Sequence, residues 1–493
     1  MKNETINQPA HEVPVWGDYD AVVCGGGPAG CAAALAAARQ GLKTLLVEGQ
    51  GQLGGMGVSG LVSHWLGGRT FDCRHWVVGG IFRELSLAGV KRGIAKLPDV
   101  APEGRYSPHG WCRGGPITAG VPFDPFGMAA LLDDAMLDAG VDVLFYTRVV
   151  DVRLTKGRLT HLVLHNKSGF LAVAANVVID ATGDADVAAL AACPTTLGRE
   201  EDRLMTPVTL QVHMDHIDVE ALAGYANDHG QGGAFRWLPE IQALMESGEW
   251  PFEYNRLISV QLLEPDVFMV NTSRLTGCDG TDGASVSRAM MQGRREALQL
   301  LAILRKHAPG FANARIKAIA PLLGVRETRR IRGDYVMTVE AVMSGKAAAD
   351  GIGFSAYGWD LPDPKRPSHQ PLEGWHKPEF TPIPYRVMLP RGMANLICPG
   401  RAVSVERDVL GPLRVMAPCM AMGEAAGTAA AQAIREKRTF AQVDIDTLRQ
   451  TLRQNGAIVD ADAIRQNPVD IEAAMIVYAN LPIEAHEQEE VTS

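Results

Sequence analysis

A run of glycines between an apolar strand and an alanine-rich helix is the feature that most restricts how this chain folds. The segment Tyr19–Cys24 is short and apolar, as a buried strand is, and it ends at the sequence GGGPAG. An alanine-rich stretch follows and ends at Gly41; Lys43–Val47 is a second apolar run, and Glu48 comes directly after it. This order predicts a β-α-β unit whose glycines let the chain turn tightly between strand and helix.

The spacing of the glycines is typical of a loop that binds the pyrophosphate of a dinucleotide. Gly25, Gly27 and Gly30 form the pattern G-x-G-x-x-G. The first glycine allows the turn, the second lets the backbone approach a pyrophosphate, and the third lets the helix lie close to the strand. Glu48 follows at the distance where an acid accepts hydrogen bonds from a ribose 2′-hydroxyl. Because a carboxylate repels a 2′-phosphate, we do not expect NADP at this loop.

Length and composition restrict the class of protein further. The chain has 493 residues, too many for one ordinary hydrophobic core, so we expect two or three packed units. Its net charge is −9 and it has no basic block interleaved with aromatic residues, so nucleic acid is not an expected partner. Glycine, aspartate or arginine interrupts every long apolar stretch, which predicts that no segment spans a membrane.

The eight cysteines are scattered along the chain, and no two of them form a C-x-x-C pair. This argues against zinc ribbons, iron–sulfur sites and a disulfide framework, and no metal site is predicted. Scattered cysteines without a disulfide pattern are typical of proteins in the reducing cytosol. Residues 1–14 lack the apolar core of a signal peptide. We therefore expect a cytoplasmic protein, and the sequence leaves open whether it is a monomer or a homodimer.

Further elements along the chain alternate between strand and helix. A helix is predicted over 126–139, and alternating strands with turns at 156–157 and 166–169 lead to a buried strand over 177–181. After these strands the chain changes character, mixing short strands with one long helix over 284–307. It then returns with a strand, a turn and a strand in PYRVMLPRGMANLICPGRAVS, followed by a helix dense in small residues, VMAPCMAMGEAAGTAAAQAIREKR.

A chain that opens with a β-α-β unit, leaves it and returns to it builds one discontinuous domain around an inserted one. The predicted parts are 15–87, 126–192 and 385–438 for the nucleotide-binding domain, 88–125 for a surface excursion, 193–384 for an inserted substrate domain, and 439–493 for a helical C-terminal segment.

Three segments together resemble the FAD-binding fold of the glutathione reductase and fumarate reductase superfamily. They are DAVVCGGGPAGCAAALAAARQGLKTLLVE, VVIDATGDADVAALA and NLICPGRAVS with GEAAGTAAA. Within the insert, residues 279–335, which end in GVRETRRIRGDY, resemble a large bacterial family of FAD-dependent oxidoreductases. The resemblance covers most of residues 15–455. It implies an α/β fold with a discontinuous Rossmann-like FAD-binding domain of glutathione reductase type, an inserted α+β substrate domain and a helical C-terminus.

The resemblance also implies which residues hold FAD. The glycine loop would hold the pyrophosphate and Glu48 the ribose, and a helix that opens near Met422 would turn its N-terminal dipole toward the flavin. Arg401 stands where many relatives have aspartate, so the role of its side chain stays open. The predicted cofactor-binding residues are Gly25, Gly27, Pro28, Ala29, Gly30, Glu48, Gly54, Gly55, Met56, Val149, Ala181, Gly183, Asp184, Gly400, Arg401, Met422, Gly423 and Ala426.

Several motifs of related flavoproteins are missing. No C-x-x-x-x-C follows Gly55, so the redox disulfide of disulfide reductases is not expected. No second G-x-G-x-x-G lies between a strand and a helix, so no NAD(P)H domain is expected, and GCDGTDG at 277–283 is interpreted as a turn. The motifs of flavin monooxygenases and halogenases are also missing. Dioxygen or another electron acceptor, which the sequence does not identify, would complete the cycle.

Four residues are candidates for catalysis: His64, Arg326, Tyr385 and Arg386. His64 in VSHWLGG has two functional interpretations, general base or covalent flavin anchor, and His75 and Cys73 are alternatives for these roles. For each of the three, a packed polar residue without a catalytic role is the competing interpretation.

The other candidates come from two arginine-containing segments. Arg326 belongs to a dense arginine cluster with Arg329 and Arg330, which either pairs with Glu327 or binds an anion. Tyr385 and Arg386 come just before the third FAD segment, and their place in the chain favours a position near the flavin.

These features predict an oxidoreductase that transfers a hydride between flavin N5 and a small organic substrate. The family suggests a hydroxylated or carbohydrate-like molecule as one substrate class. Two alternatives stay open: an enzyme of the tRNA-modifying flavoprotein type, and a non-catalytic FAD-binding subunit.

Overall fold

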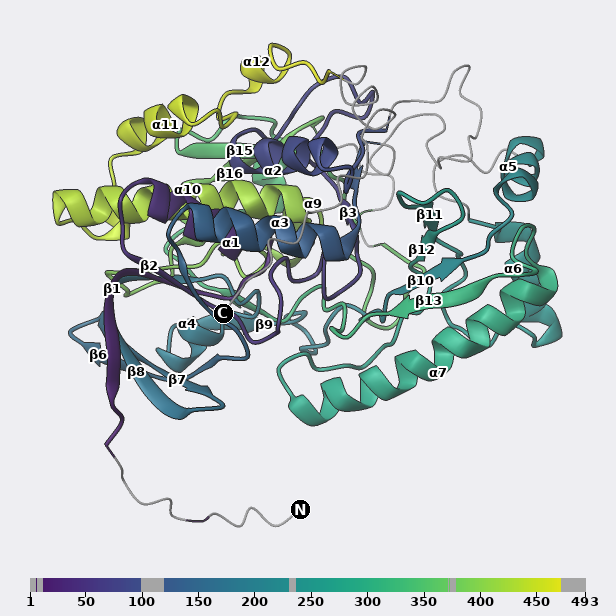
Figure 1. Ribbon diagram of the computed structural model, residues 1–493, viewed down its shortest axis with the longest axis horizontal. Helices are drawn as coiled ribbons and strands as arrows, with labels where there is room; N and C mark the ends of the chain where they lie inside the picture. The colour runs from purple at the N-terminus through teal and green to yellow at the C-terminus, as the bar shows by residue number, and fades with distance from the viewer. Residues whose placement is uncertain are drawn as a thin grey trace, which may run out of the picture.

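A parallel sheet built around the first strand positions the glycine loop (Figure 1). Its neighbour order is β5 (Asp142–Leu144), β2 (Thr44–Val47), β1 (Val15–Cys24) and β8 (Gly169–Asp180), and β17 (Leu396–Ile397) pairs with the end of β8. All of these pairings are parallel, which confirms the predicted α/β class. The computed structural model describes residues 6, 12–98, 119–229, 236–370, 372 and 378–470.

The glycine loop connects β1 to α1 (Pro28–Arg39), as the sequence predicts. Two glycines of the loop are required by close approach of the backbone. A Cβ atom on Gly30 would lie 1.7 Å from the carbonyl oxygen of Gly25, and one on Gly25 would lie 2.6 Å from that of Ala181. Gly25 also has a φ of +100°, a conformation that other residues rarely adopt.

The alanine-rich face of α1 packs against α10 (Met416–Glu436). A Cβ atom on Gly423 would lie 2.0 Å from the carbonyl oxygen of Ala29, so this glycine lets the two helices touch. The prediction that this helix opens near Met422 is wrong, because it begins at Met416. Met422, Gly423 and Ala426 therefore lie inside α10, where all three are buried.

Two further strands extend the sheet as an antiparallel meander. β6 (Arg148–Thr155) and β7 (Arg158–Asn166) pair with each other, and β7 pairs with the first half of β8. The turns fall where the sequence predicts them, with positive φ at Lys156 and Gly157 in the first turn.

The middle of the chain forms a second sheet with its own core. The antiparallel order is β11 (Ser259–Gln261), β12 (Phe268–Val270), β10 (Val212–Asp215) and β13 (Arg315–Ile319). The long helix α7 (Gly283–His307) contributes to this core and confirms the predicted helix. Figure 1 shows this unit at one end of the molecule and the β6–β8 meander at the other.

The segments that return from the insertion pack against α10. β15 (Gly351–Ser355) pairs with β16 (Thr381–Pro384), and both contribute to the main core. The prediction that PYRVM is a strand is wrong: Tyr385–Met388 forms the 3-10 turn η2. The main core thus takes in residues from Met337 to Ile383, whereas the six-part domain division stays a prediction.

The predicted surface excursion is described in part. Residues 99–118 lie outside the described ranges, but Ala119, Val121 and Phe123 are buried, so the described end of this excursion is interior. In the described ranges, no helix combines the length and apolar character that crossing a membrane requires.

The remaining elements are short. They are β3 (His64–Trp65), α2 (Gly80–Lys91), β4 (Val121–Pro122), α3 (Pro125–Asp138), α4 (Asp186–Leu190), β9 (Thr195–Leu197), α5 (Val219–Asp228), α6 (Leu238–Ser247), β14 (Arg329–Ile331), α8 (Val339–Met343), η3 (Arg407–Val409), α9 (Leu410–Leu413), η4 (Phe440–Gln442), α11 (Ile445–Gln454) and α12 (Ala461–Ile464).

Candidate functional site

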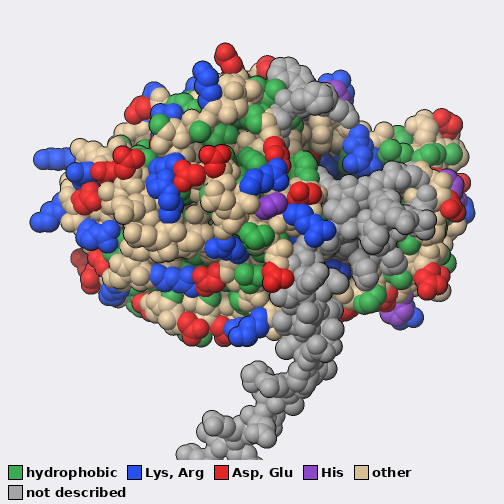
Figure 2. All heavy atoms as spheres, turned by 90° about the horizontal axis from the view of Figure 1, so that it is seen from above, with side chains coloured by type: hydrophobic (Ala, Val, Ile, Leu, Met, Phe, Trp, Pro, Cys, Tyr) green, Lys and Arg blue, Asp and Glu red, His purple; other side chains and the backbone are tan. Residues whose placement is uncertain are grey.

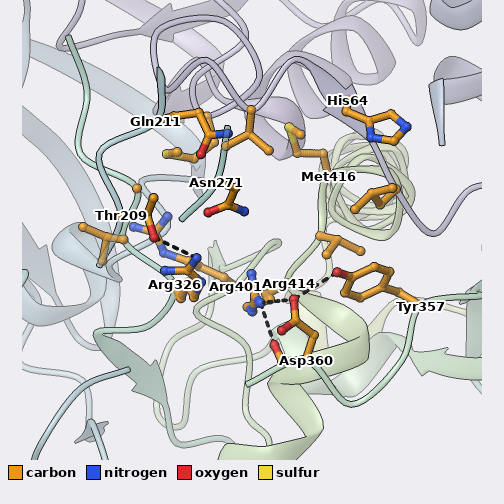
Figure 3. A pocket seen from close by; sticks show the side chains of 16 residues that line it. His64, Thr209, Gln211, Asn271, Arg326, Tyr357, Asp360, Arg401, Arg414 and Met416 are labelled. Atoms are coloured by element: carbon orange, nitrogen blue, oxygen red, sulfur yellow. Dashed lines mark hydrogen bonds and ion pairs between the residues drawn. The ribbon is translucent and has the colours of Figure 1, made fainter. Parts of the chain in front are cut away.

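A pocket lies where the nucleotide-binding elements meet the inserted sheet (Figure 3). The empty space in it, including the part open to solvent, is about 780 Å³. Met56, His64 and Met416 line it from the nucleotide-binding side. Gln211 and Asn271 line it from the inserted sheet. The pocket therefore combines apolar and polar walls from distant parts of the chain.

His64 lines this pocket from β3 and is fully buried. Burial lowers the pKa of the imidazole to about 3, with further lowering by the charges of Arg69 and Lys96. The Arg69 guanidinium donates to the carbonyl oxygens of Ala119 and Gly120, which holds that segment in place beside the ring. His64 is therefore a neutral imidazole at physiological pH, able to accept a hydrogen bond but a weak proton acceptor.

Arg326 is the member of the predicted arginine cluster that reaches the pocket. Its Nη1 donates to the Pro207 carbonyl oxygen at 2.6 Å, and its Nη2 donates to Thr209 Oγ1 at 2.9 Å. Burial lowers the pKa of Arg326, and repulsion from Arg274 and Arg414 lowers it further. These two hydrogen bonds use only part of the guanidinium's five N–H donors.

The other arginines of that cluster are bound elsewhere. Arg329 Nη1 lies 2.8 Å from Asp186 Oδ1, and Arg330 Nη1 donates to the Gly198 carbonyl oxygen. Glu327 pairs with Arg407 rather than with its arginine neighbours in the chain. The sequence left two interpretations of this cluster open, pairing with Glu327 or binding of an anion. Of its three arginines only Arg326 lines the pocket, so anion binding is an interpretation for Arg326 alone.

A buried network closes the opposite wall of the pocket. Arg414 Nη2 lies 3.0 Å from Asp360 Oδ2, and the Tyr357 hydroxyl donates to the same oxygen at 2.9 Å. Burial alone would raise the pKa of Asp360, but the charges of Arg414, Arg274 and Arg326 outweigh it and lower the pKa. The Asp360 carboxylate is therefore ionised and balances one of these three cations.

The start of α10 also faces the pocket, since Arg414, Val415 and Met416 line it. Val415 is the N-cap residue and supplies no side-chain cap to the first turn. The free N–H groups and the positive end of the helix dipole are therefore directed at this pocket wall.

The surroundings of Gly27 show whether the glycine loop has room for a dinucleotide. A Cβ atom placed on it would meet no protein atom within 4 Å, and its backbone is extended, so the protein itself does not require glycine there. Gly27 is the N-cap residue of α1 and leaves the first turn without a side-chain cap. Space and unpaired N–H groups at a helix start fit a pyrophosphate.

Glu48 lies at the end of β2, beside the loop. Its Oε2 accepts from the Gly26 N–H and its Oε1 from the Gln50 N–H, both at 2.6 Å. The predicted adenine contact, Val149, follows shortly after Thr147, whose N–H donates to the Glu48 carbonyl oxygen. The structure thus brings this part of β6 near Glu48, and the contact of Val149 with adenine stays a prediction.

The remaining predicted cofactor residues gather around the same loop. The Gly54 N–H donates to the Gly26 carbonyl oxygen, and a Cβ atom on Gly55 would lie 2.8 Å from Gly27 Cα. Pro28 and Ala29 open α1, and Ala181 donates to the Cys24 carbonyl oxygen from the end of β8.

Arg401 connects this loop region to the pocket. Its Nη2 lies 2.6 Å from Asp184 Oδ1, and the residue also lines the pocket. Gly183 and Gly400 both have positive φ, and a Cβ on Gly183 would lie 3.0 Å from the Arg401 guanidinium carbon. The side chain whose role the sequence left open therefore pairs with the acid of the second glycine-acid segment.

Tyr385 and Arg386 are not among the residues that line the pocket. The Tyr385 hydroxyl donates to the Phe440 carbonyl oxygen at 3.0 Å. Arg386 is half-exposed and lies over the ring of Tyr335, 4.1 Å from its centroid. Both side chains are thus bound to partners outside the pocket, so we withdraw them as catalytic candidates. Cys73 and His75 do not line the pocket either.

Sequence reasoning missed most of the polar wall. Gln211, Asn271, Tyr357 and Asp360 lie in segments that carry no motif. Arg414 could have been predicted from the sequence, because it lies just before the helix of small residues that the sequence identified.

Comparison with known proteins identifies one family. A family model described as FAD dependent oxidoreductase matches residues 20–452. No curated protein is significantly similar to the chain.

Similar solved structures include three at 13–14% identity. A geranylgeranyl bacteriochlorophyll reductase-like protein from Thermoplasma acidophilum is 14% identical, with 91% of this chain and 95% of that chain covered and a TM-score of 0.44. The myxobacterial chondrochloren halogenase is 14% identical, with 89% and 79% covered and a TM-score of 0.46. The p-nitrophenol 4-monooxygenase from Pseudomonas putida is 13% identical, with 94% and 92% covered and a TM-score of 0.42.

Proposed function

Because this chain belongs to the FAD-dependent oxidoreductase family, we propose that a small organic substrate exchanges a hydride with FAD in the pocket beside α10. One observation carries the proposal: the predicted cofactor residues Met56 and Arg401 line the same pocket as polar side chains from the inserted sheet. FAD, when bound, supplies the hydride acceptor or donor. The residues of the chain bind and orient the substrate and exclude water.

The glycine loop is proposed to hold FAD. Gly27 and the start of α1 would bind the pyrophosphate, and Glu48 would accept from the ribose. Met56, Arg401 and the start of α10 would lie near the flavin. The open space at Gly27 supports this assignment, because no protein atom fills it.

Three groups of side chains have different roles at the pocket. His64, neutral because it is buried, accepts a hydrogen bond from a substrate hydroxyl or amine and orients it for oxidation; its pKa of about 3 makes it too weak a base to hold the proton at neutral pH. Arg326 and the start of α10 stabilise negative charge on the substrate. Met56, Val62 and Met416 restrict the entry of water, which strengthens these interactions.

We also infer that the FAD-binding part is of the glutathione reductase type. The parallel arrangement of β5, β2, β1, β8 and β17, with an antiparallel meander joined to it, supports this subclass.

The distribution of charge favours a small-molecule substrate over RNA. The net charge is −9, and on the face seen in Figure 2 the acidic and basic side chains are interspersed rather than gathered into a basic stripe. Proteins that bind nucleic acid neutralise phosphates with clustered Lys and Arg.

The test is anaerobic mixing of the FAD-loaded protein with a panel of hydroxylated metabolites, amines and organic acids. The proposal predicts that at least one compound bleaches the flavin absorbance with saturable kinetics. Readmission of air then shows whether dioxygen restores the colour. A fully loaded flavin that stays oxidised with every compound contradicts the proposal and favours a non-catalytic FAD-binding subunit.

A further inference from the structure

Two carboxamide side chains face the pocket without protein partners. Gln211 is 2% exposed, and its Nε2 forms no hydrogen bond among the described residues. The Oδ1 of Asn271 is buried and likewise has no partner within the described ranges. Figure 3 shows both side chains at the cavity. Burying an unpaired amide is unfavourable, so a group that completes these bonds is expected from a ligand.

Together the two amides offer one donor and one acceptor. A hydroxyl group is complementary to this pair, because it accepts one hydrogen bond and donates another. Exchanging oxygen and nitrogen in both side chains again leaves one donor and one acceptor, whereas exchanging them in one side chain alone would leave two donors or two acceptors.

The part of the pocket around Asp360 carries more positive than negative charge. Arg326, Arg414 and Arg274 lie close enough to repel one another, and Asp360 is the carboxylate that faces them within the described part of the chain. Arg274 also has a buried Nε and Nη1 without partners in the described ranges, and its guanidinium lies over the ring of Tyr254. Buried charge of one sign is stabilised when an anion pairs with it.

We propose that the pocket binds a small hydroxy acid, with its carboxylate at Arg326 and its hydroxyl between Gln211 and Asn271. This inference rests on the proposed function and specifies its substrate class. Arginine suits the carboxylate because its planar guanidinium stays charged and offers paired donors.

The position of these groups assigns them to the substrate rather than to the flavin. Gln211, Asn271 and Arg326 belong to the inserted part of the chain. The predicted cofactor residues that reach the pocket, Met56 and Arg401, lie on the nucleotide-binding side.

The experiment measures binding of probes that cannot be oxidised by hydride transfer. The probe 2-hydroxyisobutyrate has no hydrogen on its carbinol carbon, and so does not reduce the flavin. It is compared with isobutyrate, which lacks the hydroxyl, and with 2-hydroxyisobutyramide, which lacks the charge. Titration of the FAD-loaded protein, followed by the flavin difference spectrum, gives each Kd. We expect 2-hydroxyisobutyrate to bind at least about tenfold more tightly than either analogue.

The variant Gln211→Met keeps the side-chain volume and removes the unpaired amide. It is expected to keep its FAD content and a Tm equal to or above that of the wild type, because no protein hydrogen bond is lost. It is also expected to bind 2-hydroxyisobutyrate about tenfold more weakly, with isobutyrate binding unchanged.

Gln432→Met is the matched control. Gln432 is an equally buried glutamine, but its Nε2 donates to the Asp444 carbonyl oxygen. Its replacement is expected to lower the Tm and to leave the Kd of each probe unchanged.

Each of four results overturns the inference. The first is equal binding of 2-hydroxyisobutyrate and its two analogues, and the second is wild-type binding by Gln211→Met. The third is loss of FAD from Gln211→Met, which assigns the residue to the cofactor. Rapid bleaching by a neutral metabolite combined with no binding of the acid probes would contradict the hydroxy acid while leaving the proposed function intact.

Discussion

At the scale of single residues, Gly27 is the clearest sign that a ligand belongs at the glycine loop. A Cβ there meets no protein atom within 4 Å, so Gly27→Ala is expected to fold normally. Its methyl group would occupy the approach of the pyrophosphate, and we expect the purified variant to lose most of its FAD. The flavin content is measured by absorbance and by chromatography of the extracted cofactor.

Gly224→Ala is the matched control for this change. A Cβ on Gly224 also meets no protein atom within 4 Å, but the residue lies in α5, far along the chain from the loop. It should retain full FAD. Full FAD in Gly27→Ala, or FMN as the extracted flavin, would show that the loop does not bind a dinucleotide.

Glu424 makes stability depend on pH. It lies buried in α10, and its Oε2 accepts from the Ile81 N–H at the start of α2. Burial raises its pKa to about 8, from an ordinary value of 4.5. Between these two pH values the folded state binds more protons than the unfolded state, so this group's contribution to stability falls as pH rises. The slope from one group is about 1.4 kcal/mol per pH unit.

Glu424→Gln keeps an acceptor for the Ile81 N–H and removes the titration. Urea unfolding at pH 5, 6, 7 and 8 is expected to show a flatter loss of stability in the variant, with its largest advantage over the wild type at pH 8. Parallel curves for the two proteins would rule out a raised pKa for Glu424.

At this scale the sequence predicts residues that belong to motifs and misses those that do not. His64 and Arg326 reach the pocket as expected. Gln211 and Asn271 come from segments whose sequence does not indicate where these two side chains point. Arg386 shows the opposite error, because closeness in the chain to an FAD segment does not fix the direction of a side chain on a 3-10 turn.

At the scale of elements, the packing of α10 on α1 places the helix start at the pocket. The sequence predicts this helix and its small residues, but the resemblance misplaced its beginning. Pro418 lies in the first turn, where proline is tolerated, and is a signal for the true start at Met416. The small residues farther along serve helix contact instead.

Gly423→Ala is therefore expected to force the two helices apart. The added methyl would lie 2.0 Å from the Ala29 carbonyl oxygen, a backbone atom that cannot move alone. We expect the free energy of unfolding to fall by roughly 1–3 kcal/mol, the usual cost of overpacking. Urea unfolding checks this, with Gly224→Ala again as the control. Unchanged stability in Gly423→Ala would contradict the close packing of α10 on α1.

At the scale of the whole molecule, the order of segments predicted the fold well. The returning strand β17 joins β8 as a discontinuous domain requires. The extent of the insertion was harder to predict, because Met337 to Ile383 has no pattern that distinguishes packing on α10 from packing on the inserted sheet. Long-range core contacts of this kind depend on tertiary structure rather than on local sequence.

The sequence carries one G-x-G-x-x-G motif that is predicted to lie between a strand and a helix, and we propose that FAD occupies it. Neither NADH nor NADPH is therefore expected to reduce the bound flavin rapidly without a mediator. Anaerobic stopped-flow mixing with each nucleotide measures this. Fast, saturable bleaching by either one would require a second nucleotide site.

The claim that substrate meets FAD in the pocket beside α10 is tested most directly by the rate of anaerobic flavin reduction in two variants. The fastest compound from the metabolite panel serves as the reductant. His64→Ala is expected to keep FAD and slow the reduction by roughly a hundredfold or more, the scale for loss of a group that orients the reacting atoms. Arg386→Ala, which changes a side chain outside the pocket, is expected to react at the wild-type rate. A wild-type rate in His64→Ala together with slow reduction in Arg386→Ala would place the reaction at the turn η2 and contradict this account.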